Sequence, residues 1–136
     1  MGHIGDDATL ALLYGAADVM VIPSRLENLP QSGTEAHACG CPVVAFNCGG
    51  LPDVVDHGVT GYLAEACNTA DLARGIAWVI RDNTINAALG AAARTKALTL
   101  WSAHSVVPAY MAVYEAARTA QRLHEIPVMA QRQQGG

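Results

Sequence analysis

The sequence predicts an α/β fold in which a partial parallel sheet is flanked by helices and followed by a long C-terminal helix. Two short apolar runs, at residues 19–22 and 42–46, have the length and composition of buried strands. A polar loop and a helical segment separate them, so the three parts form a strand–helix–strand unit with parallel strands. A third short run at 62–64 is predicted to be the last strand. With it, the chain still has fewer strands than a full doubly wound sheet.

The first elements follow from local signals. Residues 1–7 are expected to form the end of a strand followed by a turn. Asp6 or Asp7 is the expected N-cap of a helix over 8–16. The first strand is followed by a proline, which cannot extend a central ladder.

The central helix is predicted to begin at Asn28. Pro30 suits its first turn, where amides have no partner within the helix, and Glu35 falls on the second turn. After the second strand, Gly49 and Gly50 form a loop with two positions free to adopt positive φ.

The rest of the chain is predicted to be mainly helical. A short helical turn at 51–55 precedes the last strand, Asn68 or Thr69 caps the next helix, and an alanine-rich helix covers 85–98. Ser102 caps the last helix, whose apolar stripe comprises Val106, Tyr110, Val113, Tyr114 and Ala117. The stripe packs either on the chain's own helices or on a separate domain. We expect a partial domain over 1–100, a C-terminal helix over 101–124 and a flexible tail over 125–136.

Length, charge and apolar patterning narrow the class of protein. At 136 residues the chain has room for one domain with a modest core. The net charge of −4, with Lys96 as the single lysine, argues against a nucleic-acid surface. No apolar run is long enough for a transmembrane segment and the N-terminus lacks a signal-peptide pattern, so the expected location is cytoplasmic. Peripheral association with the inner face of the membrane is expected if a substrate is a lipid-linked sugar.

A cluster of potential metal ligands has a simpler interpretation. His37, Cys39 and Cys41 are close in sequence, but the paired ligand spacings of structural zinc sites are absent. Cys39 is better explained as the end of a helix, Gly40 as its left-handed cap and Cys41 as the approach to the next strand. We therefore predict free buried thiols and no metal.

Two glutamates flank the start of the central helix. Glu27 lies in the loop after the first strand, and Glu35 follows eight residues later on the helix. Both can face one crevice at the carboxyl edge of the sheet, with helix N-terminal amides between them that suit a phosphate. A helical carboxylate can accept hydrogen bonds from both hydroxyls of a ribose. Taken alone, however, the spacing favours a simpler view: a glutamate near a helix N-terminus and a solvated loop residue.

Several motifs in a fixed order resemble a known family. The chain reads AADVMVIPS, then Glu27-x7-Glu35, then EAHACGCPVVAF, then GGLPDVVDHGVTGYLA. Over residues 5 to 114 it strongly resembles the Rossmann-like C-terminal domain of GT-B-fold retaining glycosyltransferases, of the glycosyltransferase family 4 or glycosyl transferases group 1 type. The version LENLPQSGTEAHACGCPVVAFN looks like the bacterial surface-polysaccharide branch.

The resemblance implies roles for four residues. Glu27 matches the first glutamate of the family's motif, which lies against the donor sugar and is tied to catalysis. Glu35 matches the second glutamate, which binds the ribose hydroxyls. Gly49 and Gly50 match a Gly-Gly-x-Pro loop, which we interpret as a backbone requirement.

The resemblance also implies where the phosphates bind. Leu29, Pro30 and Gln31 match the segment whose amides approach the diphosphate and the donor sugar. Because Pro30 has no N–H, Gln31 and Ser32 must supply that donor. Arg25 is near the expected crevice but does not match the family's basic position, so it is either a phosphate ligand or a surface arginine.

The implied activity is transfer of a sugar from a nucleoside-diphosphate sugar to a saccharide or lipid-linked acceptor with retention, without metal or cofactor. In the family, a separate N-terminal domain binds the acceptor, and an Arg and a Lys that neutralise the diphosphate precede the part matched here. The isolated chain is therefore expected to be truncated and poorly active, or completed by a separate N-terminal-domain chain. The alternative is a non-catalytic nucleotide-sugar-binding module or a subunit of a split enzyme.

Overall fold

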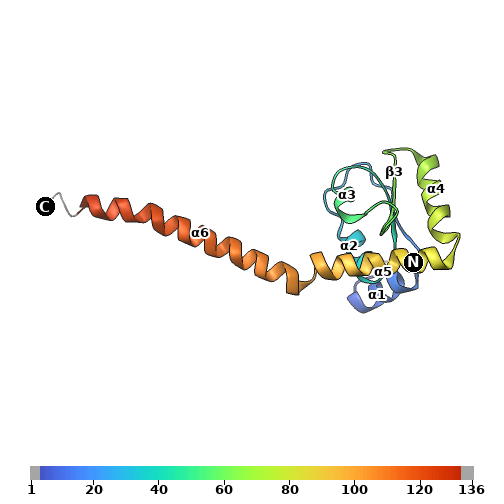
Figure 1. The fold of residues 1–136 in the computed structure, drawn as a ribbon, viewed down its shortest axis with the longest axis horizontal. Coiled ribbons are helices and arrows are strands. Elements are labelled where there is room, and N and C mark those ends of the chain that lie inside the picture. Colours follow the sequence, from blue (N-terminus) through green and yellow to red (C-terminus); the bar gives the residue numbers. More distant parts are fainter. Residues whose placement is uncertain (1–3, 133–136) are drawn as a thin grey trace. The chain divides into compact units, whose positions relative to one another are not determined.

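A computed structural model describes the backbone of residues 4–132 and the side chains of residues 4–121. The chain divides after Trp101 into two compact units. The first contains the sheet with its flanking helices, and the second is helical (Figure 1).

Parallel strands form the sheet of the first unit. In the described part of the chain they are β1 (Met20–Ile22), β2 (Val43–Phe46) and β3 (Gly61–Ala64), with β2 in the middle. The register pairs Met20 with Val43 and Val44 with Tyr62, so the carboxyl ends of the strands meet at one edge. This confirms the predicted α/β fold with a partial parallel sheet.

The helices that flank the sheet are α1 (Asp7–Ala16), α2 (Gln31–Ala38), α3 (Leu51–Val54), α4 (Thr69–Ile80) and α5 (Asn83–Leu100). Three of them, α1, α4 and α5, have an N-cap residue whose side chain accepts a hydrogen bond from a backbone amide two or three residues later. These N-caps are Asp6, Asn68 and Asp82. The predicted caps at Asp6 and Asn68 are confirmed. Helix α5 starts two residues earlier than predicted because Asp82 caps it.

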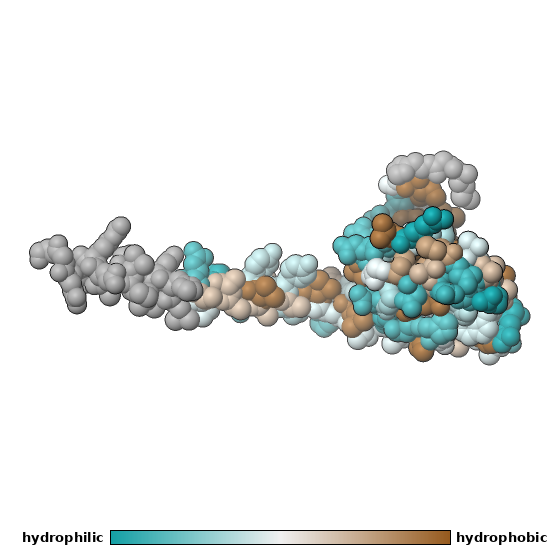
Figure 2. Space-filling model, turned by 90° about the horizontal axis from the view of Figure 1, so that it is seen from above, coloured by the Kyte–Doolittle hydropathy of each residue, from teal (hydrophilic) through white to brown (hydrophobic). Residues whose placement is uncertain are grey.

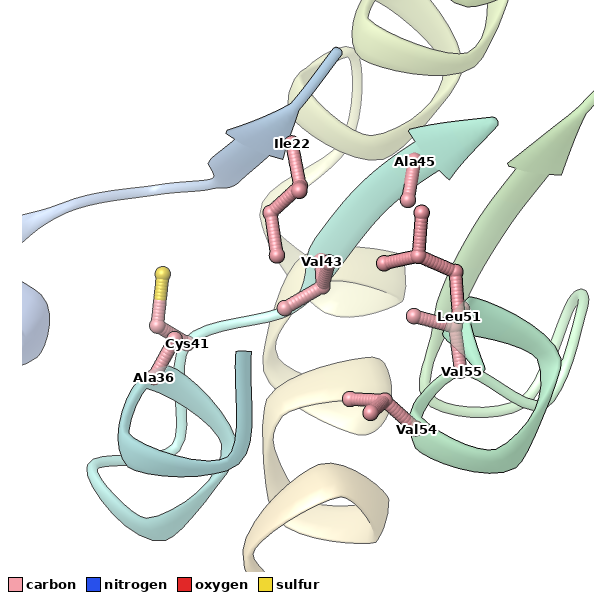
Figure 3. Close-up of a cluster of buried hydrophobic side chains, with 8 residues drawn as sticks. All are labelled: Ile22, Ala36, Cys41, Val43, Ala45, Leu51, Val54 and Val55. Atoms are coloured by element: carbon pink, nitrogen blue, oxygen red, sulfur yellow. The ribbon is translucent and has the colours of Figure 1, made fainter. Parts of the chain in front are cut away.

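The core explains why the second apolar run is continuous. All four residues of β2 are buried, and successive side chains point to opposite faces of the sheet. On one face Val43 and Ala45 join Ile22, Ala36, Cys41, Leu51, Val54 and Val55 (Figure 3). On the other face Val44 and Phe46 join Ala64, Leu72, Val79 and Leu89. Helices cover both faces of β2, so polar residues have no place on it.

The turn between α2 and β2 has the predicted conformation. Cys39 is the C-cap residue of α2, and Gly40 has a φ of 77°, in the left-handed region. Cys41 is a buried free thiol, and burial raises its pKa to about 11. Of the other three cysteines, Cys39 and Cys48 are only partly buried, and Cys67, before α4, is exposed, so the predicted burial is confirmed for Cys41 alone.

The second unit contains helix α6 (Ala103–Arg132). The hydroxyl of Ser102 accepts a hydrogen bond from the amide of Ser105 at 3.3 Å, as expected of the predicted cap. The helix continues into the segment predicted as a flexible tail, and residues 133–136 of that segment lie outside the described residues. The predicted domain boundaries stay predictions.

The surface of the first unit mixes polar and apolar residues in the view of Figure 2. Its exposed large apolar side chains include Leu12, Leu26 and Leu29. Single exposed apolar residues are ordinary on protein surfaces. None of the helices in the described residues is both long enough and apolar enough to cross a membrane.

Candidate functional site

The candidate site is built on two loops that leave the sheet at its carboxyl edge. The loop 23–30 follows β1 and carries Glu27, and the loop 47–50 follows β2. The thiol of Cys48 donates a hydrogen bond to the carbonyl of Ser24 at 3.3 Å, and the amide of Gly50 donates one to the carbonyl of Glu27 at 3.1 Å. The backbone of Glu27 is therefore held in place by the neighbouring loop.

Gly49 and Gly50 permit the close approach of these loops. A Cβ atom on Gly49 would lie 1.9 Å from the carbonyl oxygen of Glu27, and one on Gly50 would lie 1.6 Å from that of Asn28. Gly49 has a φ of 54°, which glycine adopts readily. Gly50 has a φ of −90°, so at this position the requirement for glycine is steric and not the predicted positive φ.

The side chain of Glu27 is half-buried. Its Oε1 accepts a hydrogen bond from the amide of Asn28 at 3.3 Å, within the same loop. Among the described residues no Lys or Arg forms an ion pair with it, and the nearby Arg25 is exposed. The carboxylate of Glu27 therefore retains acceptor sites for a ligand. Its negative charge is available to stabilise positive charge that develops on a bound ligand.

Helix α2 begins at Gln31, three residues later than predicted. Pro30 is its N-cap residue, and the Pro30 carbonyl accepts a hydrogen bond from the amide of Gly33 at 3.0 Å. A proline disfavours the helical conformation in the residue before it, so the helix cannot include Leu29. Pro30 itself is extended, with a ψ of 118°, and the helix begins at the next residue. The amides of Gln31 and Ser32 make no hydrogen bond in the described structure and are available to an anion.

Glu35 is the fifth residue of α2 and contacts α1. Its Oε2 accepts a hydrogen bond from the hydroxyl of Tyr14 at 3.3 Å. Burial of the Tyr14 side chain, together with the negative charge of Glu35, raises the pKa of Tyr14. A groove of about 290 Å³ lies between the two helices, and its lining includes Asp7, Leu10 and Tyr14 on one side and Glu35, Ala38 and Cys39 on the other.

The structure brings together some of the predicted site residues. Gly49 and Gly50 contact the loop that carries Glu27, and the free amides of Gln31 and Ser32 follow that loop directly. Glu35 lines the groove beside α1, whereas Glu27 does not. A crevice shared by the two carboxylates therefore stays a prediction, as do the roles of the individual residues.

Two residues that support the site were not predicted from the sequence to do so. Tyr14 is 21 residues from Glu35, and Cys48 is 24 residues from Ser24, so no local pattern pairs them. In the sequence, Tyr14 follows Leu10 and Leu13 at helical spacing, which indicates only an apolar face of the helix over 8–16. Its hydroxyl on that face was the one available hint that it meets a polar partner.

His37, considered above as a metal ligand, is part of the interior. Its ring stacks on Trp101 with centroids 6.1 Å apart, and neither ring nitrogen has a hydrogen-bond partner. Burial, and then the charge of Lys96, lower its pKa to about 4. Within residues 4–121, no group of three or more His, Cys, Asp or Glu side chains is arranged to hold a metal ion.

Comparison with known sequences identifies the family. Residues 1–96 match the family model described as Glycosyl transferases group 1. N-acetyl-alpha-D-glucosaminyl L-malate synthase of Bacillus anthracis is 30% identical over 111 residues, which cover 82% of this chain and 29% of that protein. D-inositol 3-phosphate glycosyltransferase of Geodermatophilus obscurus is 42% identical over 109 residues, which cover 78% of this chain and 24% of that protein. The chain thus spans less than a third of the length of these relatives.

Solved structures agree with this result. Sucrose-phosphate synthase from Thermosynechococcus elongatus has a TM-score of 0.82 at 32% identity, over 88% of this chain and 30% of that one. Anabaena HepE in complex with UDP-glucose has a TM-score of 0.72 at 29% identity, over 85% of this chain and 31% of that one. These neighbours share the GT-B C-terminal-domain fold, which confirms the predicted fold class. The chain therefore belongs to the glycosyl transferases group 1 family.

Proposed function

We propose that this chain supplies the donor-binding part of a retaining glycosyltransferase, which moves a sugar from a nucleoside-diphosphate sugar to a saccharide or lipid-linked acceptor. The observation that carries the proposal is the start of α2: two free amides at the carboxyl edge of the sheet, with one glutamate before them and one after. Membership of the family supports glycosyl transfer as the reaction class. The similarity to HepE, solved with UDP-glucose, supports a nucleotide sugar as the donor.

In this proposal the parts of the donor bind along α2. The amides of Gln31 and Ser32, at the positive end of the helix dipole, bind the diphosphate. The carboxylate of Glu35 accepts hydrogen bonds from the two ribose hydroxyls. Leu29 and Pro30 lie at the donor-sugar end, where Pro30 contributes no amide donor.

Glu27 is the proposed catalytic residue. When the bond between the anomeric carbon and the diphosphate oxygen breaks, positive charge develops on the sugar and negative charge on the leaving diphosphate. The carboxylate of Glu27 stabilises the former, and the amides at the start of α2 stabilise the latter. The acceptor hydroxyl then forms the new bond on the same face of the sugar, and its proton passes to the departing diphosphate oxygen.

The proposal also covers the acceptor and the place of action. The resemblance of residues 26–47 to surface-polysaccharide enzymes supports a role in polysaccharide biosynthesis. We expect the reaction on the cytoplasmic side, at the inner face of the membrane when the acceptor is lipid-linked.

Titration calorimetry with UDP and with GDP tests the donor site. Glu35→Ala should weaken binding of the preferred nucleotide about tenfold or more, because hydrogen bonds to a charged acceptor are each worth ~1.5–3 kcal/mol. Glu27→Gln should leave nucleotide affinity unchanged and lower sugar transfer. Glu115→Ala, an exposed change on α6, is the control. Equal affinities of the wild type and Glu35→Ala would remove the ribose assignment.

A further inference from the structure

Glu35 has a defined partner, the hydroxyl of Tyr14. The hydroxyl donates to Oε2 at 3.3 Å and links α1 to α2. In the described part of the chain, no Lys or Arg forms an ion pair with Glu35. The tyrosine is therefore the group that orients this carboxylate.

The aromatic ring determines where that hydroxyl lies. Tyr14 is partly buried and packs against the apolar cluster that contains Ala36 and Cys41. A ring held by such packing loses little further freedom when its hydroxyl bonds, whereas an exposed glutamate on a helix has several rotamers available. The hydrogen bond from the rigid Tyr14 side chain thus restricts the rotamers of the flexible Glu35 side chain.

The carboxylate keeps enough capacity for a ligand. An ionised carboxylate has about four acceptor sites, and Tyr14 occupies one of them on Oε2. Oε1 has no hydrogen-bond partner in the described structure. A vicinal diol donates two hydrogen bonds, so a ribose and the tyrosine can bind the same carboxylate together.

We propose that Tyr14 is a positioning residue for Glu35: its hydroxyl holds Oε2, and this leaves Oε1 oriented to accept a hydrogen bond from a vicinal diol such as that of a ribose. This inference rests on the proposed function, since it assigns the diol to the nucleotide bound at Glu35. A bond that merely ties α1 to α2 would affect unfolding. A positioning bond affects discrimination between a nucleotide with the diol and one without it.

The test measures the affinities of UDP and 2′,3′-dideoxy-UDP by calorimetry, with GDP and its dideoxy form as a second pair. Tyr14→Phe removes only the hydroxyl and keeps the ring in the core. It should weaken binding of the nucleotide with the diol about three- to tenfold, the range for loss of one hydrogen bond, and leave the dideoxy affinity unchanged. Tyr62→Phe is the matched control, because it removes a tyrosine–carboxylate hydrogen bond of 2.8 Å to Asp71 elsewhere in the first unit.

The outcomes separate this inference from the proposed function. If Glu35→Ala abolishes the preference for the diol but Tyr14→Phe keeps it in full, the positioning role is wrong and the proposed function stands. Equal weakening of both nucleotides by Tyr14→Phe would also overturn the positioning role. If the wild type lacks the preference, or Glu35→Ala retains it, the ribose assignment falls and the inference falls with it.

A second measurement uses the unaltered protein. The ring carbon of Tyr14 that bears the hydroxyl, labelled with 13C, reports on its hydrogen bond by NMR. Its signal should shift on addition of UDP (or GDP) and shift less on addition of the dideoxy form. Identical shifts with the two forms would contradict the inference.

Discussion

Replacing His37 by methionine should remove a pH dependence that we expect in the stability of the wild type. His37 is fully buried on α2, and its ring nitrogens have no hydrogen-bond partner. Burial and the charge of Lys96 lower its pKa from 6.5 to about 4, and they outweigh the Thr60 carbonyl and Asp56, which favour the protonated ring.

The sign and size of the effect follow from this pKa. Between pH 6.5 and about 4 the unfolded chain binds a proton at this histidine and the folded protein does not, so lowering the pH favours unfolding. Above this interval the ring is neutral in both states, and below it the ring is protonated in both. An interval of about 2.5 pH units, at ~1.4 kcal/mol per unit, corresponds to a loss of about 3.5 kcal/mol when the whole interval is crossed. Domains are typically stable by only ~5–15 kcal/mol, so this loss is measurable.

Urea unfolding followed by circular dichroism, at pH values from neutral down to about 4.5, provides the assay. Methionine is apolar and adaptable, and it removes the two unpartnered nitrogens, so stability at neutral pH should be unchanged or rise by about 1 kcal/mol. His104→Met, at an exposed position on α6, is the control. The capping carboxyls Asp6 and Asp82 have pKa values lowered from 3.8 by hydrogen bonds to backbone amides, so their stabilisation is lost only below the His37 interval.

Two results would refute the reasoning. A wild-type free energy of unfolding that stays constant over this interval would mean that the folded protein accepts the proton on His37 without penalty. A slope that persists in His37→Met would mean that another group carries it.

Further predictions concern the backbone and a cap. Gly50→Ala places a Cβ against the Asn28 carbonyl and should lower the free energy of unfolding by about 1–3 kcal/mol. It should also weaken nucleotide-sugar binding. An unchanged urea midpoint would contradict the close approach of the two loops. Gly15→Ala, in α1, meets nothing within 4 Å and should raise stability by about 0.5–1 kcal/mol, so a loss would argue against the helix at this position. Asp6→Ala removes the hydrogen bond of 2.8 Å from the Thr9 amide and should lower the thermal midpoint at neutral pH, with the difference disappearing once acid protonates the cap.

The elements that could be predicted are those whose signals are local. The continuous apolar run of β2 indicates a strand covered on both faces, and Asp6 and Asn68 mark helix starts because capping is a contact over a few residues. The start of α2 was predicted wrongly although its signal was present. Proline is favoured in a first helical turn, but it disfavours helix in the residue before it, and this excludes the predicted helical conformation at Leu29.

The residue types of the candidate site could also be predicted, but not the contacts that hold them. The order of motifs singles out Glu27, Glu35 and the Gly49–Gly50 pair. That Gly50 is needed for steric reasons depends on the loop after β1 lying against it. No pattern within either loop contains that information.

By itself the sequence determined the order of helices and strands, the apolar run that becomes the central strand, and the family to which the chain belongs. Only the tertiary structure decided that Cys48 binds the loop of Glu27, that Tyr14 holds Glu35, and that His37 is sealed in the interior. The physical reason is distance along the chain. Capping and hydrophobic periodicity depend on residues that are close in sequence, whereas these contacts join residues more than twenty positions apart. They form only when β1 pairs in parallel with β2 and the helices pack on that sheet.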